Sequence, residues 1–354
     1  MTERRSFEGI GGWPRVLARL MAGDDLEADE AAVCLGEILE GRATPAQIAA
    51  FAVALRAKGE SVEEISGLVS AMLDHAEVVP GVEADGLVDT CGTGGDRSGS
   101  INVSTLAALV AAGAGARVCK HGNRAASSDC GSADVLEALG VAIEIGPDAV
   151  ARCLDQAGMA FCFAPRFHPA LRHAGPVRRE LGVPTVFNFL GPLANPARVR
   201  RQVIGVSDPA MAEKMMGVLV ARGAVRALVV HGRDGLDELS TTGPSTVLDL
   251  DDGQVSTYEV DPVALGIAPV SAEALRGGDA TKNASLVRRV LSGEHGAHRD
   301  IALLNGAAAI VVAGLVADIA GGLELAARSV DDGSAARVLE RLVTASNAGV
   351  TASP

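Results

Sequence analysis

Apolar residues in the first eighty positions recur with the period of an α-helix. Ile48, Phe51 and Leu55 fall on one helical face after Thr44-Pro-Ala-Gln47, which is a capping box with proline at the first helical position. Ser61-Val-Glu-Glu64 is a second capping box and precedes another apolar stripe. Short amphipathic helices need a partner surface to bury such stripes. The pattern predicts a small helical domain that also serves for dimerisation.

Beyond Pro80-Gly81 the hydrophobic pattern changes, and short apolar runs alternate with helical patterns. Strands are expected at 86–88, 117–119, 142–145, 203–206 and 227–230, and helices from Ser104, Ser132 and Pro147 and over 208–222. The runs 246–250 and 255–260, joined across 251–253, predict a hairpin near the sheet edge. Such alternation is typical of the α/β class, so we expect a central, largely parallel sheet.

The rhythm of strands is interrupted between about 165 and 195. The segment His168–Glu180 has a helical pattern, and Gly191–Pro196 has the composition of a loop. We expect this segment to be an excursion back to the helical domain. The predicted organisation is a helical domain at 1–80 joined by that excursion, an α/β domain at 81–164 and 196–345, and a disordered tail at 346–354.

The composition constrains what builds the core and what the protein binds. Hydrophobic residues make up 48% of the chain and aromatic residues 3%, so Ala, Val and Leu must supply most of the core. The formal net charge of −13 argues against a general affinity for nucleic acid or for an anionic membrane. The stretch Ile301–Ala317 is apolar except for Asn305 and is shorter than the roughly 20 residues that span a bilayer. We therefore expect a buried helix there.

The cysteines and the N-terminal residues bear on the cellular compartment. The six cysteines show no Cys-x-x-Cys pair and no spacing typical of a disulfide framework. Reduced thiols that act as small hydrophobic residues are the expected state. Met1–Ser6 leads into no apolar signal core, so export is not expected. These features together predict a cytoplasmic protein.

A glycine-rich segment is the first candidate for anion binding. Asp89-Thr-Cys-Gly-Thr-Gly-Gly-Asp96 follows a predicted strand, and a helix begins near Ser104. Glycines let backbone N–H groups approach an anion, and a helix N-terminus points further N–H groups at the same place. The spacing matches neither the Gly-x-Gly-x-x-Gly of dinucleotide sites nor the P-loop. By itself, the segment is equally compatible with an ordinary turn between a strand and a helix.

A basic segment follows the next predicted strand. Lys120-His-Gly-Asn-Arg124 is followed by Ser127-Ser128, and Gly131-Ser132 opens another helix. Alone, the segment would be interpreted as a solvated basic loop. Because parallel strands end at the same edge of a sheet, we expect it to lie beside the glycine-rich segment. A local cluster of cations in so acidic a chain then favours the binding of phosphate.

Two further pairs of charged residues are candidates for chemistry. Asp237-Glu238 follows a predicted strand, and adjacent carboxylates repel each other unless a cation such as Mg²⁺ lies beside them. Exposed loop acids are the alternative interpretation. Arg178-Arg179 could be surface charges that pair with Glu180, although an arginine fork is also the best side chain for holding a planar carboxylate.

Taken together, these segments closely resemble the anthranilate phosphoribosyltransferase family of tryptophan biosynthesis, and the resemblance covers most of the chain. Each motif alone is weak, whereas their order and spacing are highly specific. The motifs that carry the resemblance are Gly92-Thr-Gly-Gly-Asp96, Asn102-Val-Ser-Thr105, Lys120-His-Gly-Asn-Arg124 with Ser127-Ser128, Gly131-Ser-Ala-Asp134, Val177-Arg-Arg-Glu-Leu-Gly182, Gly191-Pro-Leu-Ala-Asn-Pro196 and Asp237-Glu238.

The resemblance implies a reaction, a cofactor and an assembly. Members of this family join anthranilate to 5-phosphoribosyl 1-diphosphate (PRPP), release pyrophosphate and require Mg²⁺, with two ions expected per active site. The resemblance also implies a homodimer that forms through the small helical domain, with the active site at the hinge between the two domains. Neither nucleic acid nor a membrane is an expected partner.

Carried onto this sequence, the resemblance assigns three groups of residues. PRPP would be held by Gly92, Gly95, Asp96, Ser100, Asn102, Val103, Ser104, Thr105, Lys120, His121, Gly122, Asn123, Arg124, Ala125, Ala126, Ser127, Ser128 and Ser132. Anthranilate would contact Gly92, Asn123 and Arg178, with Arg178 on its carboxylate. Magnesium would be bound by Ser104, Asp237 and Glu238. No general acid or base is assigned, because the amine of anthranilate is already neutral, and His121 is expected to shape the loop.

Small departures and two alternatives accompany this interpretation. Arg97 stands where the family usually has glycine, and Ser100 stands where it usually has threonine. A nucleoside phosphorylase of related fold is the nearest rival, but Arg178 suits a carboxylate better than a pyrimidine. A non-catalytic relative that binds nucleic acid would need a basic surface and altered carboxylates. This chain has a pI near 5.0 and retains Asp237-Glu238.

Overall fold

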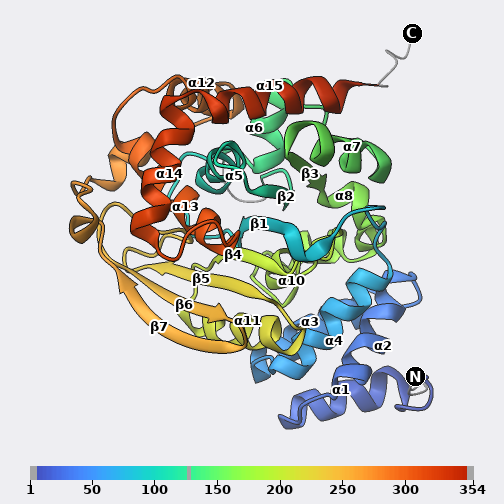
Figure 1. Cartoon of the computed structure of the whole chain (residues 1–354). Helices are drawn as coiled ribbons and strands as arrows, with labels where there is room; N and C mark the ends of the chain where they lie inside the picture. Colours follow the sequence, from blue (N-terminus) through green and yellow to red (C-terminus); the bar gives the residue numbers. More distant parts are fainter. Residues whose placement is uncertain (1–5, 126–128, 349–354) are drawn as a thin grey trace.

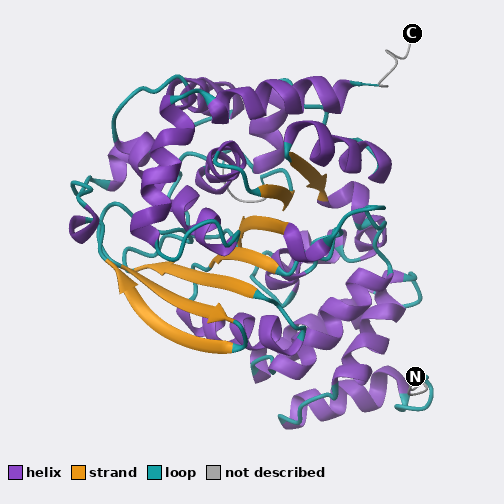
Figure 2. Cartoon of the chain, in the orientation of Figure 1, coloured by secondary structure: helices purple, strands orange, loops and turns teal. Residues whose placement is uncertain are grey.

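The computed structural model describes residues 6–125 and 129–348. A central sheet carries helices on both faces, and the helices of the N-terminal residues form a separate group beside it (Figure 1). The strands all belong to the larger part of the molecule (Figure 2). The predicted fold class, a helical N-terminal domain followed by an α/β domain with a largely parallel sheet, is confirmed.

The sheet has seven strands in the order β3-β2-β1-β4-β5-β6-β7. The first five in this order are parallel to their neighbours, and the last two form an antiparallel extension, as the predicted hairpin requires. The strands are β1 (Leu87–Gly92), β2 (Arg117–Gly122), β3 (Met159–Phe163), β4 (Arg201–Gly205), β5 (Arg226–Gly232), β6 (Ser245–Asp251) and β7 (Gln254–Val260). Because β2, β1, β4 and β5 are parallel, the segments that follow them leave the sheet at one edge.

Four helices make up the helical domain, and eleven more follow it in the described residues. The first four are α1 (Gly12–Ala22), α2 (Ala28–Leu39), α3 (Pro45–Lys58) and α4 (Val62–Asp74). The others are α5 (Val103–Gly113), α6 (Ser132–Ala138), α7 (Pro147–Ala157), α8 (Ala164–Phe167), α9 (Gly175–Leu181), α10 (Phe187–Leu193), α11 (Pro209–Ala221), α12 (Ala280–Leu291), α13 (Ala297–Val312), α14 (Ile319–Asp331) and α15 (Ser334–Asn347). Short 3-10 turns lie at η1 (Ala84–Gly86), η2 (Pro169–His173), η3 (Val263–Leu265) and η4 (Ala272–Leu275).

Two apolar cores lie on opposite faces of the sheet. Along β5, Leu228 and Val230 belong to one core and Ala227 and Val229 to the other, as the alternation of side chains along a strand requires. The first core includes residues of α5, α7 and α12 to α15, and the second includes residues of α10, α11 and the helical domain. The second core therefore joins the helical domain to the sheet.

Both predicted capping boxes form in the helical domain. The N–H of Gln47 donates to Thr44 Oγ1 at 3.3 Å, and the N–H of Thr44 donates to Gln47 Oε1 at 2.9 Å. At the start of α4 the N–H of Glu64 donates to Ser61 Oγ at 3.1 Å, and the N–H of Ser61 donates to Glu64 Oε2 at 2.8 Å. Each box satisfies two backbone donors that a helix start otherwise leaves unpaired.

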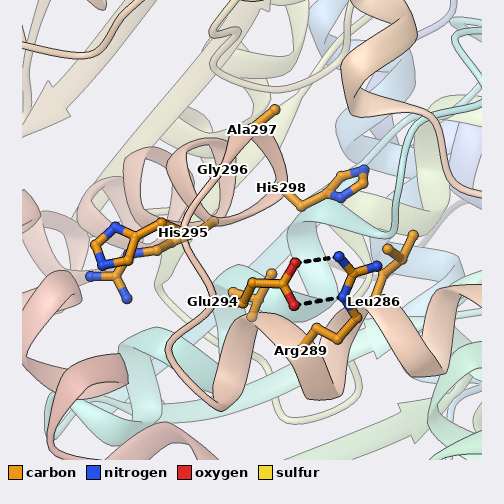
Figure 3. A pocket seen from close by; sticks show the side chains of 9 residues that line it. Leu286, Arg289, Glu294, His295, Gly296, Ala297 and His298 are labelled. Atoms are coloured by element: carbon orange, nitrogen blue, oxygen red, sulfur yellow. Dashed lines mark hydrogen bonds and ion pairs between the residues drawn. The ribbon is translucent and has the colours of Figure 1, made fainter.

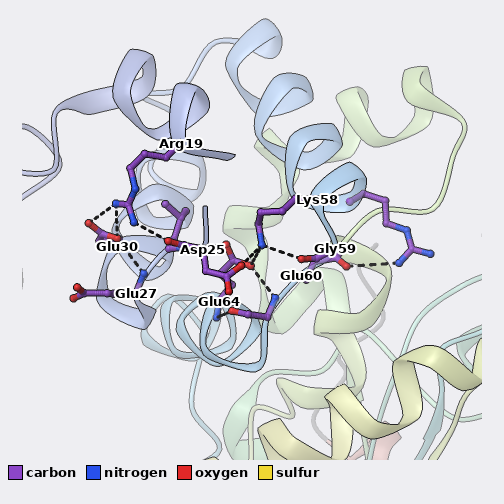
Figure 4. A network of polar contacts seen from close by, with 11 residues as sticks. Arg19, Asp25, Glu27, Glu30, Lys58, Gly59, Glu60 and Glu64 are labelled. Atoms are coloured by element: carbon purple, nitrogen blue, oxygen red, sulfur yellow. Dashed lines mark hydrogen bonds and ion pairs between the residues drawn. The ribbon is translucent and has the colours of Figure 1, made fainter. Parts of the chain in front are cut away.

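A network of ion pairs stabilises the same four helices (Figure 4). Lys58 Nζ lies 2.9 Å from Glu64 Oε2, and Glu64 Oε1 accepts from the N–H of Leu26 at 3.0 Å. Arg19 Nη1 lies 2.8 Å from Glu30 Oε2. Glu64 is fully buried, and a buried carboxylate is tolerated only when it is paired in this way. The network joins all four helices, because its members lie on or beside each of them.

The segment between β3 and β4 contacts the helical domain. α9 contacts α3, and α10 contacts α4. Arg56 of α3 lies over the ring of Phe189 at 5.6 Å, and its Nη2 is 3.4 Å from Asp208 Oδ2 at the start of α11. The segment is flanked by β3 and β4 of the sheet. The chain therefore leaves the α/β domain after β3, packs against the helical domain and returns to the sheet at β4.

The predicted strand at 142–145 is wrong. Residues 142–145 do not pair with the sheet, since the N–H of Ala142 donates to Ser346 Oγ of α15 at 3.1 Å. β3 lies further along the chain, and its five residues are all buried. Two other boundaries differ: Gly191–Leu193 lie in α10 rather than in a loop, and α15 continues to Asn347 in the predicted tail. Residues 349–354 of that tail lie outside the described residues.

The expectations of a buried helix near residues 301–317 and of buried cysteines can be compared with the structure. Residues 301–312 of α13 are all buried, which confirms the predicted internal helix. Within residues 6–125 and 129–348, no helix has the length and apolarity needed to cross a membrane. The six cysteines are buried and are not joined in disulfides. The thiols of Cys119 and Cys162 lie 3.6 Å apart on neighbouring strands.

Candidate active site

The glycine-rich segment and the acidic pair come together at the C-terminal edge of the sheet. The N–H of Gly94 donates to Asp237 Oδ2 at 2.7 Å. A Cβ at Gly92 would lie 2.4 Å from the same oxygen, and a Cβ at Gly205 would lie 1.6 Å from the carbonyl oxygen of Asp237. Any side chain at these two glycines would therefore displace the acidic segment. The sequence requires glycine there because the backbone of β1 and β4 is the surface on which Asp237 packs.

Glu238 and Lys120 converge on the first turn of α5. The N–H of Ser104 donates to Glu238 Oε1 at 3.1 Å, and Lys120 Nζ donates to Ser104 Oγ at 3.1 Å. Lys120 Nζ also donates to the carbonyl oxygen of Thr90. Lys120 is only 1% exposed, so its ammonium group is held inside the protein between β1 and α5. The basic and glycine-rich segments therefore meet at Ser104, as their positions in the sequence predict.

Burial and like charges perturb the two acids. Burial raises the pKa of Asp237 to about 7, and the neighbouring carboxylate of Asp96 adds to the effect. Burial also raises the pKa of Glu238 well above its usual value, with a further contribution from Asp237. Loss of hydration and mutual repulsion both disfavour ionised carboxylates. A cation beside them would remove this penalty, so the acidic pair is suited to a positively charged ligand.

The donors at this edge fit a hard cation such as magnesium. Asp96, Asp237, Glu238 and the hydroxyl of Ser104 offer oxygen atoms, which magnesium prefers over nitrogen or sulfur. Among the described residues, no group of three or more His, Cys, Asp or Glu side chains is placed so that it could hold a metal ion by itself. A magnesium ion here would complete its shell with oxygen atoms of water or of a bound ligand.

The glycine-rich loop takes a left-handed course above α5. Gly94, Gly95 and Gly99 have φ values of 68°, 84° and 63°, and Arg97 has a φ of 55° although it carries a side chain. Ser100 lies in the same loop, where its Oγ accepts a hydrogen bond from Ser98 Oγ at 3.1 Å. Arg97 is exposed, and the structure gives it no acidic partner among the described residues. Its left-handed backbone costs about 1–2 kcal/mol relative to glycine.

The basic segment is ordered by its own hydrogen bonds. Arg124 Nη1 lies 3.0 Å from Asp134 Oδ1 and 2.8 Å from Glu137 Oε2, and these hydrogen bonds raise the pKa of Arg124. Ser132 Oγ donates to the carbonyl oxygen of Asn123 at 3.2 Å, and Ala125 N–H donates to Asp134 Oδ2 at 2.9 Å. Arg124 is therefore paired with two acids in this structure, so binding of a phosphate by Arg124 would require an exchange of partners.

Other residues predicted to bind PRPP are buried or lack a side chain. Val103 and Thr105 are buried in the first turn of α5, and Gly122 ends β2. A Cβ at Gly122 would lie 2.2 Å from Ser132 Oγ. Ala126, Ser127 and Ser128 lie outside the described residues.

His121 is buried and neutral. Its Nδ1–H donates to the carbonyl oxygen of Gly191 at 3.0 Å, and its ring lies 5.1 Å from the ring of His168. Burial lowers the pKa of His121 to about 3 and that of His168 to about 4. A neutral imidazole that already donates to a backbone carbonyl is a structural group. The prediction that His121 shapes the loop agrees with this geometry.

Arg178 lies apart from the hydrogen-bonded network. Its guanidinium group is 5.7 Å from the centre of the Phe187 ring, and burial lowers its pKa. The described residues include no acid paired with Arg178, and it does not pair with Glu180 as the alternative interpretation required. Arg178 is linked to the basic segment through α10, which begins at Phe187 and contains Gly191, the acceptor of His121.

Sequence reasoning missed a buried aspartate that holds these segments together. Asp89 Oδ1 accepts from the N–H of His121 at 3.0 Å, and Asp89 Oδ2 accepts from Asn195 Nδ2 at 2.8 Å. Asn195 Nδ2 also donates to the carbonyl oxygen of Cys119 at 2.8 Å. Two features of the sequence could have indicated this role: Asp89 is an acid inside an apolar strand, and Asn195 lies within the Gly191–Pro196 motif.

A pocket of about 190 Å³ lies elsewhere, between α12 and α13 (Figure 3). Arg289, which lines this pocket, is paired with an acid, because its Nε donates to Glu294 Oε2 at 2.7 Å. None of the residues that were predicted to bind a ligand lines it. The residues that line it are Leu286, Arg289, Val290, Glu294, His295, Gly296, Ala297, His298 and Arg299.

Comparison with known proteins extends over both parts of the chain. Residues 84–336 match the family described as "Glycosyl transferase family, a/b domain", and residues 14–76 match "Glycosyl transferase family, helical bundle domain". Anthranilate phosphoribosyltransferase of Roseiflexus sp. (strain RS-1) is 55% identical over 336 residues, which cover 94% of this chain and 98% of the relative. That of Arthrobacter sp. (strain FB24) is 53% identical over 350 residues, with coverages of 97% and 99%.

Solved structures give the same result. The crystal structure of anthranilate phosphoribosyltransferase from Thermus thermophilus has a TM-score of 0.89 and 42% identity, and covers 94% of this chain and 99% of its own. The Saccharomyces cerevisiae enzyme in complex with PRPP and Mg has a TM-score of 0.85, 28% identity and coverages of 95% and 98%. The yeast enzyme in complex with 4-fluoroanthranilate has a TM-score of 0.84, 26% identity and coverages of 96% and 99%.

The chain belongs to the glycosyl transferase family that combines a helical bundle domain with an α/β domain. Within this class it groups with the anthranilate phosphoribosyltransferases, so the resemblance carried by the sequence motifs is confirmed.

Proposed function

We propose that this chain transfers the 5-phosphoribosyl group of PRPP to the amine of anthranilate, giving N-(5-phosphoribosyl)anthranilate and pyrophosphate in tryptophan biosynthesis. One observation carries the proposal. The glycine-rich loop, the buried Lys120 and the acidic pair meet through hydrogen bonds at Gly94 and Ser104 on one sheet edge. The names of relatives at 53–55% identity support the same reaction.

The phosphates of PRPP bind to the glycine-rich loop and the first turn of α5. The left-handed glycines expose backbone N–H groups, and the start of α5 adds the positive end of a helix dipole. Lys120 supplies a fixed positive charge behind this turn. Arg124 contributes when it exchanges Asp134 and Glu137 for a phosphate, while Asn123, Ser132 and the backbone of the basic segment complete the site.

Magnesium binds to Ser104, Asp237 and Glu238, with two ions per active site. The support is the oxygen donor set, the raised pKa values of both acids, and the yeast relative that was solved with PRPP and Mg. When bound, magnesium neutralises the charge of the diphosphate and of the two acids. The residues of this chain hold the acids in place through the N–H groups of Gly94 and Ser104.

Anthranilate binds beside Gly92 and Asn123 with its carboxylate on Arg178. A half-buried guanidinium group that has no acidic partner within residues 6–125 and 129–348 gains most from a planar carboxylate, with which it forms two parallel hydrogen bonds. Phe187 holds the guanidinium group from one side. The yeast relative solved with 4-fluoroanthranilate supports a ring of this size and charge.

The mechanism relies on position and electrostatics. Displacement at the anomeric carbon passes through a state with oxocarbenium character, as in glycoside transfer. Lys120 and the backbone N–H groups stabilise the negative charge that develops on the departing diphosphate. The amine of anthranilate is neutral and needs no strong base. His121 is neutral and already donates to Gly191, so it does not supply a proton. Correct placement of two substrates supplies much of the rate.

We propose that the chain is a cytoplasmic protein and that it forms a homodimer through its helical domain. Met21 of α1 is 81% exposed and Val53 of α3 is 44% exposed, so apolar side chains of this domain are available to a second copy. Association of these faces would bury surface that a monomer leaves in water. Sedimentation analysis tests the dimer, and Met21→Lys with Val53→Lys should shift the mass to that of the monomer.

An assay of anthranilate fluorescence tests the reaction. The chain is mixed with PRPP, magnesium and anthranilate, and the expected result is loss of anthranilate fluorescence with release of one pyrophosphate per anthranilate. Omission of either PRPP or magnesium is the control. Phosphorolysis of thymidine or uridine without consumption of PRPP would overturn the proposal and favour a nucleoside phosphorylase. Tight, salt-sensitive binding of DNA without consumption of PRPP would favour the non-catalytic alternative.

A further inference from the structure

A buried asparagine outside the predicted site holds the residue that bridges the two phosphate-binding segments. Asn283 lies in the first turn of α12 and is 1% exposed. Its Nδ2 donates to Asn102 Oδ1 at 2.9 Å, and Asn102 Nδ2 donates to the carbonyl oxygen of Cys130 at 2.9 Å. Asn102 ends the glycine-rich loop, and Cys130 follows the basic segment. Asn102 therefore bridges the end of the glycine-rich loop and the stretch after the basic segment, and Asn283 holds Asn102 in the orientation that makes this bridge.

The orientation of the two amides is fixed at both ends. Asn283 Oδ1 accepts from the N–H of Gly278 at 2.8 Å, so its Nδ2 must face Asn102. Asn102 then has to present its oxygen to Asn283, which leaves its own amide N–H for the carbonyl of Cys130. A carboxylate at either position would bring two acceptor oxygens together, and repulsion would replace a hydrogen bond. The arrangement requires an amide at both positions.

The pairing of the two amides also explains why Asn102 does not cap its helix. Asn102 is the N-cap residue of α5, a position at which asparagine usually accepts from the first N–H groups of the helix. Here the side chain makes no capping hydrogen bond, because it is occupied by Asn283 and Cys130. The first turn of α5 is instead capped by Glu238, through the N–H of Ser104.

Backbone hydrogen bonds also join the glycine-rich loop to the segment that precedes α12. The N–H of Gly277 donates to the carbonyl of Gly99 at 2.9 Å, and the N–H of Ile101 donates to the carbonyl of Leu275 at 3.0 Å. A Cβ at Gly277 would lie 2.5 Å from Asn283 Oδ1, so glycine is required for this approach. The segment 275–278 thus runs antiparallel to 99–101, and Asn283 fixes it from behind.

We infer that Asn283 is a positioning residue for PRPP: through Asn102 it sets the distance between the glycine-rich loop and the basic segment, and hence the fit of both segments to one phosphorylated ribose. This inference rests on the proposed function. Asn283 itself does not touch the substrate. Its effect is transmitted by Asn102, which belongs to the predicted PRPP site, and by the carbonyl of Cys130.

The first test separates the binding of PRPP from that of anthranilate. Asn283→Asp keeps the volume and the acceptor for Gly278, so α12 is retained, but it places an oxygen against Asn102 Oδ1. We expect KM for PRPP to rise about tenfold, because residues that share one hydrogen-bond network are energetically coupled. KM for anthranilate should rise clearly less, by no more than about threefold, because its carboxylate is held by Arg178, which lies outside both segments, although Gly92 and Asn123 lie within them.

The matched control is Ser329→Ala. Ser329 is 2% exposed, lies in α14 and donates to the carbonyl oxygen of Val110 at 2.8 Å. This variant removes a buried hydrogen bond between a C-terminal helix and α5, but it leaves the two segments untouched. If Asn283→Asp and Ser329→Ala change KM for PRPP equally, or if KM for both substrates rises to the same extent, the inference is wrong.

The second test uses a double variant. If Asn283 acts through Asn102, then Asn102→Ala combined with Asn283→Ala should have the same KM for PRPP as Asn102→Ala alone. Effects that multiply would show that Asn283 acts independently of Asn102 and would overturn the inference. Should Asn283→Ala fail to fold, Asn283→Asp with Asn102→Ala completes the same cycle.

Hydrogen exchange tests the positioning without any substrate. Asn283→Asp should speed amide exchange in residues 99–102 and 129–131 relative to Ser329→Ala, with other peptides of α5 and β1 unchanged. Unchanged exchange in both segments, or faster exchange throughout the chain, would refute the inference. Failure of the proposed function is distinguishable, because the unmodified chain would then not consume PRPP, whereas hydrogen exchange would still report whether Asn283 orders the two segments.

Discussion

The phosphate side and the anthranilate side of the candidate site are held in different ways. On the phosphate side, Lys120 is bonded to Ser104, and Arg124 is paired with Asp134 and Glu137. On the anthranilate side, Arg178 lies over an aromatic ring, and the described residues give it no acid. A ligand with several charges needs many donors in fixed places, whereas a ligand with one carboxylate needs one fork that is free to receive it.

The two sides should contribute to the free energy of substrate binding in different ways. The hydrogen bonds of Lys120 and of the Ser104 N–H are already formed, so they fix geometry before the ligand arrives and lower the entropy lost on binding, whereas Arg124 must first exchange its acidic partners. Arg178 is partly desolvated and has no charged partner among the described residues, so it gains a charge-assisted pair only when the ligand arrives. Changes on the phosphate side should therefore act mainly on PRPP and its metal, and changes at Arg178 should act mainly on anthranilate.

The largest effect is expected from the acidic pair. Asp237→Asn with Glu238→Gln should lower kcat/KM by about 100-fold at about 1 mM magnesium, because the oxygen charges that attract the cation are lost. More magnesium should restore part of the activity in an assay of pyrophosphate release. Asp234→Asn is the matched control, since Asp234 is bonded to Ser240 within the same loop. Unchanged demand for magnesium in the double variant would contradict the metal assignment.

Arg178→Ala should affect one substrate only. We expect KM for anthranilate to rise by about 10–100-fold, since hydrogen bonds to charged groups contribute about 1.5–3 kcal/mol. KM for PRPP should change by less than about threefold. Steady-state kinetics with each substrate varied in turn measures both constants, and Arg179→Ala on the exposed side of α9 is the control. Equal rises in the two constants would show that Arg178 serves general structure.

The pH dependence of stability isolates Asp237. The folded state raises the pKa of this acid from 3.8 to about 7, so its ionisation destabilises the metal-free protein as pH rises through that range. Asp237→Asn has no ionisable group at this position, so it is not destabilised in this way. The variant should therefore gain stability relative to the unmodified chain between pH 5 and pH 8, by more than about 1 kcal/mol, since one pKa unit corresponds to about 1.4 kcal/mol.

The informative quantity is the difference in free energy of unfolding between Asp237→Asn and the unmodified chain. The lowered pKa values of His121 and His168 act in the opposite direction, because their neutral folded forms add stability as pH rises from about 4 towards the usual histidine pKa. That contribution is common to both proteins and cancels. Urea unfolding at pH 5 and pH 8 without magnesium measures the difference. A constant difference at the two pH values would rule out a perturbed Asp237.

The smallest effect is expected from Arg97→Gly. Arg97 is an exposed cation on the glycine-rich loop, so its loss should raise KM for PRPP about twofold to threefold at low salt, and the effect should vanish near about 0.5 M salt. Relief of the left-handed backbone and the added freedom of glycine oppose each other, so Tm should change by only about two degrees. Arg97→Lys keeps the charge and should keep the KM.

Much of this architecture could be predicted from the sequence, and the exceptions have physical causes. Capping boxes and the alternation of apolar runs depend on local chemistry, so Thr44, Ser61 and most strands were placed correctly. The run 142–145 was misassigned because its partner, Ser346, lies about two hundred residues away and no local pattern reveals it. β3 was missed because a short apolar run fits a buried helix equally well.

The same limit applies to the candidate site. Lys120, Asp237 and the glycines were recognisable because charge and glycine in loops are visible in a sequence. The roles of Asp89 and Asn283 were not recognised, because their partners come from distant segments and the two roles depend on burial. The pairing of Arg124 with Asp134 and Glu137 was also hidden, since a sequence shows a cation but not which acids surround it.

The two glycines that face Asp237 have a consequence for anyone who redesigns this enzyme. At Gly205 even the smallest side chain would overlap the aspartate main chain, so libraries that randomise β4 or β1 will return inactive clones at Gly205 and Gly92 whatever substrate is selected. Diversity is better directed to positions such as Gly191 of α10, where an added Cβ would meet no atom within 4 Å.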